Sequence, residues 1–178
     1  MIVDLAELRL KRKPLYVDSD FRESQLSVSG TIARLAEPVH ANLMVALESE
    51  RVTVQGRLGT VLGLRCCRCA SEFEQSADKD FVLTYLPDPE TVKDGEELEL
   101  EYDDLDVGFY RGDQLDLAVV LTEQILLEIP MKPVCRPDCK GLCDQCGIDL
   151  NMGTCDCTRK VMDPRLAALA EIKKRITN

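Results

Sequence analysis

The distribution of cysteine constrains the fold of this chain more than any other feature. The chain has nine cysteines in 178 residues, and five of them lie within residues 139–157. They fall into three groups: RCCRC (65–69), Cys135-x3-Cys139, and Cys143-x2-Cys146 followed by Cys155-x-Cys157. Two thiolates three positions apart can bind one tetrahedral ion if the chain turns sharply between them. The pattern therefore predicts a compact Cys-rich module.

The N-terminus, MIVDLAELRLKRKPL, bears on the choice between metal binding and disulfides. Asp4 and Glu7 precede its basic run and no long apolar stretch follows, so it does not resemble a secretory signal. The sequence also lacks a run of about eighteen apolar residues that could span a membrane. We therefore expect a cytoplasmic protein with thiols in a reducing environment, where dense cysteines favour metal binding.

Zinc suits four thiolates in a structural role because it has no redox chemistry. The predicted ligands of one ion are Cys143, Cys146, Cys155 and Cys157, with Gly147 easing the turn after the second thiolate. A candidate second set consists of Cys66, Cys69, Cys135 and Cys139. The sequence therefore predicts one or two zinc ions and leaves Cys67 spare. Two alternatives stay open: a split zinc ribbon that pairs Cys66 and Cys69 with Cys143 and Cys146, and an iron–sulfur cluster.

Short β-rich runs separated by turn-like residues occupy the first part of the chain. In VHANLMVAL (39–47) apolar residues alternate with others, which is typical of a strand with one buried face. The predicted strands are 26–32, 39–47, 51–58, 61–66 and 81–86. Their spacing favours an antiparallel meander or a partial barrel.

The apolar segment 113–129 predicts a helix buried against this sheet, with Asp113 as its N-cap and Pro130 at its end. Before it, residues 87–104 read as an acidic surface excursion that contains a candidate edge strand at 98–102. Residues 163–176 predict a short C-terminal helix.

The expected fold class is α+β, predominantly an antiparallel meander or partial barrel with a buried helix. It would carry a zinc-ribbon-like module and a short C-terminal helix. We expect three parts along the chain. They are a β-rich core domain at 1–134, a Cys-rich zinc-binding module at 135–160, and a C-terminal helix or tail at 161–178.

The formal net charge of −10 is unevenly distributed. Residues 88–128 contain fourteen acidic residues and only two basic ones, Lys93 and Arg111. A chain this acidic is a poor general phosphate binder, because counterion release requires clustered cations. The acidic stretch reads either as a solvated loop or as a surface for a basic partner.

No residue pattern supports catalysis. His40 is the chain's one histidine and lies on the polar face of the predicted strand 39–47, so it reads as solvated. The carboxylates of 88–104 lack an environment that would shift their pKa values. A zinc ion with four thiolate ligands has no open position for a substrate. The alternative is a cytosolic thiol redox protein or sensor that uses Cys66 and Cys69.

Three motifs resemble the YceD family of bacterial and plastid proteins. Cys66, Arg68 and Cys69 fit its C-x-R-C signature, from which Cys67 departs. CKGLCDQCGIDLN (139–151), followed by Cys155-x-Cys157, is similar to the Cys-rich segment of the family. DPRLAAL (163–169) resembles the family's C-terminal signature.

The resemblance implies a non-catalytic role in biogenesis of the large ribosomal subunit and accumulation of its RNA. The expected partners are a ribosomal protein, a large-subunit ribosomal RNA precursor, or both, with no membrane and no small-molecule substrate. In this role the acidic stretch would contact protein. Arg68, Lys140 and Arg159 are candidate phosphate contacts.

Overall fold

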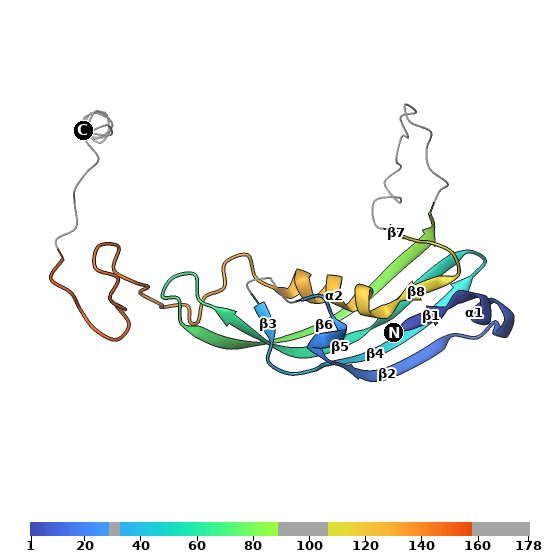
Figure 1. The fold of residues 1–178 in the computed structure, drawn as a ribbon, viewed down its shortest axis with the longest axis horizontal. Helices are drawn as coiled ribbons and strands as arrows, with labels where there is room; N and C mark the ends of the chain where they lie inside the picture. Colours follow the sequence, from blue (N-terminus) through green and yellow to red (C-terminus); the bar gives the residue numbers. More distant parts are fainter. Residues whose placement is uncertain (29–32, 89–106, 158–178) are drawn as a thin grey trace, which may run out of the picture.

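The computed structural model describes residues 1–28, 33–88 and 107–157 of the chain (Figure 1). The described elements are β1 (Ile2–Asp4), α1 (Leu5–Lys11), β2 (Leu15–Phe21), the 3-10 helix η1 (Glu23–Gln25), β3 (Ala33–Leu35), β4 (Val39–Glu48), β5 (Arg51–Arg65), β6 (Glu72–Pro87), β7 (Val107–Tyr110), β8 (Gln114–Asp116) and α2 (Leu117–Glu128). They form an α+β fold.

Six of the described strands make one sheet, in which β2, β4, β5, β6 and β7 follow one another and β3 also pairs with β5. The centre is an antiparallel meander of β4, β5 and β6. Ser49 adopts a positive φ of 58° in the tight turn between β4 and β5. At the far edge β7 runs parallel to β6, so the sheet is mixed rather than purely antiparallel. In the described residues β2 and β7 do not pair with each other, and a partial barrel is not confirmed.

The strand predictions hold best in the meander. The predicted strand 39–47 is confirmed as β4, whereas the runs 51–58 and 61–66 are one continuous strand, β5. The run 81–86 is the second half of the longer β6. The predicted strand 26–32 is wrong at its start, where residues 26–28 form a bend and turn, and Leu26 and Val28 are buried in the main core cluster. Residues 29–32 lie outside the described part.

The helix prediction needs its start corrected. Residues 114–116 are not helical because they pair as β8 with β1 near the N-terminus. The helix α2 therefore begins at Leu117, and its N-cap is Asp116 rather than Asp113. The carboxylate of Asp116 accepts hydrogen bonds from the Ala118 N–H and from the Met1 amino group, both at 3.0 Å.

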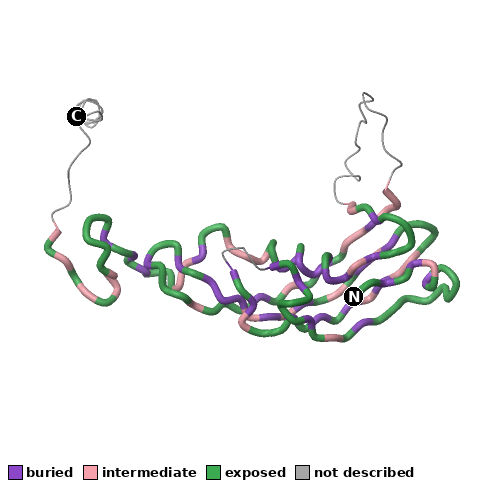
Figure 2. Tube along the Cα trace, viewed as in Figure 1, coloured by how far each residue is buried: buried purple, intermediate pink, exposed green. Residues whose placement is uncertain are grey.

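The core lies between α2 and one face of the sheet. Along β4 every second side chain is buried, as the alternating colours of the strands in Figure 2 show. Leu43 of β4, Leu58 and Leu62 of β5, and Leu121 and Ile125 of α2 belong to one buried cluster. This cluster continues to Leu5 and Leu8 of α1, so both helices bury side chains in the same core.

The Cys-rich residues extend beyond one end of the sheet, next to the loop between β5 and β6 (Figure 1). The predicted edge strand 98–102, the acidic residues 89–104 and the predicted helix 163–176 lie outside the described residues. The division into parts at 134 and 160 therefore stays a prediction. Within the described residues, no helix has both the length and the apolar character needed to span a membrane.

Candidate metal centre

Two Cys-x2-Cys loops have the same backbone hydrogen bonds. In the loop between β5 and β6, the Cys66 N–H donates to the Ser71 carbonyl at 2.8 Å and the Ala70 N–H donates to the Cys66 carbonyl at 2.9 Å. The Cys143 loop repeats this pattern: Cys143 donates to Ile148 at 2.8 Å and Gly147 donates to Cys143 at 3.0 Å. Each loop is thus a closed turn around its first cysteine.

The same loops direct backbone N–H groups toward sulfur. The Arg68 N–H lies 3.4 Å from Sγ of Cys66, and the Gln145 N–H lies 3.5 Å from Sγ of Cys143. A donor placed two residues after each thiol stabilises the thiolate form, which is the form that binds metal. The repetition shows that both loops can present two thiolates on one side of a turn.

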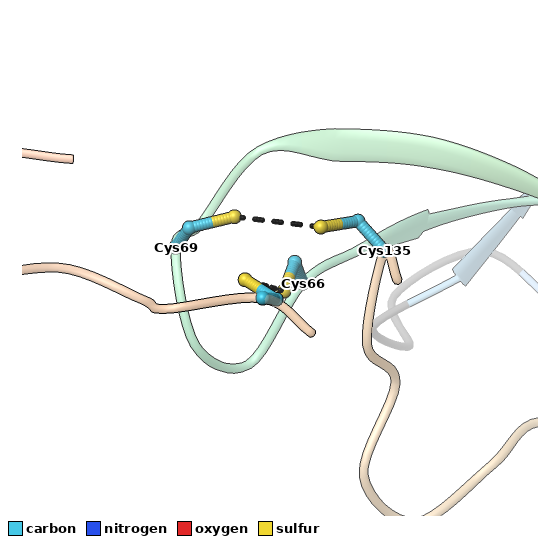
Figure 3. A group of neighbouring side chains, drawn as sticks. Cys66, Cys69 and Cys135 are labelled. Atoms are coloured by element: carbon cyan, nitrogen blue, oxygen red, sulfur yellow. Dashed lines mark hydrogen bonds between the residues drawn. The ribbon is translucent and has the colours of Figure 1, made fainter. Parts of the chain in front are cut away.

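The first group of thiols joins two distant parts of the chain. Cys66 and Cys69 come from the β5–β6 loop, and Cys135 and Cys139 follow α2. Sγ of Cys66 lies 3.8 Å from that of Cys139, and Sγ of Cys69 lies 3.7 Å from that of Cys135. Figure 3 shows the sulfurs of Cys69 and Cys135 pointing toward each other across the loop. Three of the four residues are buried.

The second group is local and more exposed. It brings together Cys143, Cys146, Cys155 and Cys157, of which only Cys143 is buried. An isolated bridge between Leu142 and Asp149 closes the loop that carries Cys143 and Cys146. In each group the four sulfurs lie within 4.8 Å of one another. The split-ribbon alternative would pair Cys66 and Cys69 with Cys143 and Cys146, which the structure places in different groups.

The sulfur spacing fits a tetrahedral ion. Four thiolates each 2.3 Å from zinc lie about 3.8 Å from one another. The two distances in the first group, 3.8 and 3.7 Å, are close to this value. Both groups of four thiols could therefore bind a metal ion.

Hydrogen bonds lower the pKa of some of these thiols, and burial raises the pKa of others. Backbone hydrogen bonds, first from Cys135, lower the pKa of Cys66 to about 6. Burial raises the pKa of the neighbouring Cys135 to about 12. In the second group, the backbone hydrogen bond from Cys146 lowers the pKa of Cys143 to about 6. Four clustered thiols cannot all ionise without a compensating cation, and a metal ion would supply that charge.

Asn151 contacts the first group of thiols and the segment next to it. Its Nδ2 lies 3.5 Å from Sγ of Cys139, and its Oδ1 accepts from the Lys140 N–H at 2.8 Å and from Arg136 at 2.9 Å. Sequence reasoning did not assign Asn151 a role, although it ends the motif CKGLCDQCGIDLN. Groups that hydrogen-bond to metal ligands fix the orientation of those ligands.

Arg68 links the β5–β6 loop to the segment that carries Cys139. Its Nη1 donates to the carbonyls of Cys139 at 3.0 Å and Pro137 at 3.3 Å, so this part of the guanidinium is engaged within the protein. Its own carbonyl accepts from the Leu142 N–H at 3.0 Å. Gly141 permits this approach, because a Cβ there would lie 3.0 Å from the Arg68 oxygen at a φ of +77°.

The other residues singled out in the sequence lie apart from the two groups. Cys67 is exposed and belongs to neither. His40 is exposed on β4, where its Nδ1 lies 2.9 Å from Oδ1 of Asp20. This hydrogen bond raises the pKa of His40. Lys140 is exposed, and Arg159 lies outside the described residues.

Comparison with known proteins identifies the relatives of this chain. A sequence model of the family described as "Large ribosomal RNA subunit accumulation protein YceD" matches residues 54–173. The chain belongs to the YceD family. The match covers helix α2 and all eight thiols of the candidate metal centre.

Relatives of this YceD-family chain occur in bacteria and plants. An uncharacterized protein of Mycobacterium tuberculosis is 30% identical, over 97% of this chain and 81% of its own length. The Zea mays protein named "Large ribosomal RNA subunit accumulation protein YCED homolog 1, chloroplastic" is also 30% identical, over 80% of this chain and 57% of its own length. The Bacillus subtilis protein YlbN is 25% identical over 94% of this chain. No solved structure matches significantly.

The equivalent positions Ala70 and Gly147 offer a test of the two loops. Both adopt a positive φ, 60° at Ala70 and 73° at Gly147, but only glycine does so without steric cost. We expect Gly147→Ala to destabilise the metal-loaded protein by about 1 kcal/mol and Ala70→Gly to stabilise it by up to a similar amount. Chemical denaturation with excess zinc measures both changes. A change in stability of the same sign in both variants would contradict the equivalence of the two loops.

Proposed function

We propose that this YceD-family protein is a non-catalytic, cytoplasmic factor in biogenesis of the large ribosomal subunit. It would act by binding a ribosomal protein, large-subunit RNA, or both. The observation that carries the proposal is the family match over residues 54–173, whose plant relatives are named for accumulation of large-subunit ribosomal RNA. We propose no membrane or small-molecule ligand for it.

Two zinc ions would complete the described fold. Cys66, Cys69, Cys135 and Cys139 would hold one ion, and Cys143, Cys146, Cys155 and Cys157 the other. When bound, zinc would supply positive charge that lets all four thiols of a group ionise together. With four protein ligands each site is closed, which suits a structural role rather than catalysis.

Charge favours a protein partner for the Cys-rich module. Between residues 131 and 157 the chain carries three basic and four acidic residues. Four thiolates around one Zn²⁺ leave about two further negative charges at each site. Arg68 is exposed, but its Nη1 donates to two carbonyls of the module, which leaves fewer of its donors for phosphate. We infer that this surface repels phosphate more than it attracts it.

The redox alternative is less compatible with the geometry. Cys66 and Cys69 are buried beside two further thiols, whereas a redox thiol needs access for its substrate. Cys67 is the exposed thiol of this loop, and its replacement provides the matched control below.

Ribosome profiles test the proposal in a bacterium whose own YceD-family gene has been deleted. We expect deletion to lower the ratio of large-subunit to small-subunit RNA, and this chain or its Cys67→Ser variant to restore it. Sucrose gradients and quantification of both RNAs measure the effect. An unchanged ratio in the deletion strain would contradict the ribosomal role. Restoration by the wild type but not by Cys67→Ser would favour thiol chemistry.

A further inference from the structure

The face of the sheet opposite α2 carries a groove. It crosses β2, β4, β5 and β6, and its volume is about 690 Å³. The residues that line it include Tyr16, Asn42, Met44, Gln55, Arg57 and Val82. Along β4 and β6 these side chains alternate with the buried ones, so they point to solvent rather than to the core.

One row across this face is apolar in character. The strand register places Tyr16 opposite Met44, Met44 opposite Gln55, and Gln55 opposite Val82. Tyr16 is 71% exposed and Val82 is 63% exposed. Large exposed apolar side chains lined up across a solvent-facing groove are typical of an interaction surface.

In each of the next two rows across the sheet, the residues on the two outer strands, β2 and β6, are acidic. Asp18 and Asp20 lie on β2, and Asp80 and Asp78 lie on β6, with β4 and β5 between them. The basic residues among these rows are Arg57, which binds Asp78 at 2.6 Å, and His40, which is charged only when protonated. His40 lies between Asp18 and Asp20, at 3.5 and 2.9 Å. The four carboxylates thus outnumber the positive charges.

We propose that this groove binds a Lys- or Arg-rich segment of a protein partner, with an apolar side chain of that segment against Tyr16, Met44 and Val82. The inference rests on the proposed function and names the class of partner for it. An arginine side chain is well suited to the groove, since its guanidinium can pair with carboxylates and stack on a tyrosine ring. RNA is disfavoured because its phosphates would meet four carboxylates.

The test compares binding by two charge-matched double variants. Asp18→Asn with Asp80→Asn removes one carboxylate from β2 beside the groove and one from β6, where Asp80 lines it. Glu23→Gln with Glu123→Gln removes the same charge from exposed positions on η1 and on α2. The probes are individually purified ribosomal proteins of the large subunit, and separately a transcript of large-subunit RNA. Affinities are measured by fluorescence anisotropy at two salt concentrations, with melting curves to verify the fold.

We expect the wild type to bind at least one basic ribosomal protein. Loss of the two groove carboxylates should weaken this binding about tenfold and reduce its salt dependence. Tyr16→Ala should weaken it too, and the Glu23/Glu123 variant should bind like the wild type. Equal affinities for both double variants would overturn the groove and leave the proposed function intact. Binding of the RNA alone, tighter after loss of the carboxylates, would also overturn it. Binding of neither probe by the wild type would contradict the proposed mode of action itself.

Discussion

Under the proposed two-zinc arrangement, Cys66→Ser is expected to release one zinc ion and to separate the β5–β6 loop from the segment after α2. Structural zinc in small modules contributes on the order of 10 kcal/mol of apparent folding free energy. The loss should be confined to one end of the molecule, because Cys66, Cys69 and Cys139 form a small buried cluster apart from the main core. Elemental analysis measures the loss as a fall from two zinc ions per chain to one.

Limited trypsin digestion locates the opened region. Arg68 lies inside the first Cys-x2-Cys loop, and Lys140 follows Cys139. The peptide bonds after Arg68 and Lys140 are therefore both next to residues of the first thiol group. We expect Cys66→Ser to accelerate cleavage after both residues and leave the sheet intact. Cys67→Ser is the matched control, since this neighbouring thiol is exposed and lies outside both groups. It should keep two zinc ions and the wild-type digestion pattern.

Cys143→Ser distinguishes two separate zinc sites from a single shared site. The second thiol group lies wholly within residues 143–157, so its loss should remove one zinc ion and leave the Arg68 bond protected. The double variant Cys66→Ser with Cys143→Ser should bind no zinc. If either single variant lost all the metal, or if Cys143→Ser exposed Arg68 as much as Cys66→Ser does, a single shared ion would replace the two-site arrangement.

The sequence predicts the parts of this fold that depend on local pattern. Alternation in VHANLMVAL identified β4 because one of its faces is buried and the other is exposed. The strand β2, LYVDSDF, was missed, since it has only two buried side chains, Val17 and Phe21. The start of α2 was misplaced by a non-local effect. Residues 114–116 pair with Ile2–Asp4, more than a hundred positions away, and no local signal reports such pairing.

The candidate site shows the same division. Cysteine spacing predicted the two groups of four thiols that the structure brings together, but it left the split ribbon open, because only the folded chain places Cys66 and Cys69 beside Cys135 and Cys139. The residues that contact the thiols, in contrast, are determined by tertiary structure. Arg68 was considered as a phosphate contact, yet it donates to carbonyls 69 and 71 positions later in the chain. Asn151 could have been noticed as the last residue of the Cys-rich motif, but its contact with Cys139 requires the folded chain.

Gly56→Ala is expected to destabilise the meander more than any other alanine substitution at a glycine of β5. Gly56 pairs with Leu43 in the strand register, and a Cβ there would lie 2.3 Å from the Asn42 carbonyl and 2.6 Å from Cδ2 of Leu43. The backbone oxygen cannot move without shifting β4, which contributes Leu43 to the core. Forcing a methyl group into such a packed position costs about 1–3 kcal/mol. Urea unfolding followed by circular dichroism measures this loss.

Gly59→Ala is the matched control in the same strand. A Cβ at Gly59 meets no atom within 4 Å, and its φ lies outside the positive range that disfavours L-residues. Alanine there should therefore leave stability unchanged or raise it slightly, because it restricts the unfolded chain. The difference between the two variants isolates the close approach of β4 and β5 from the general effect of replacing glycine in a strand. Equal stabilities would mean that β4 and β5 can separate at Gly56 without cost, and that the packing of Leu43 against β5 does not hold the meander together.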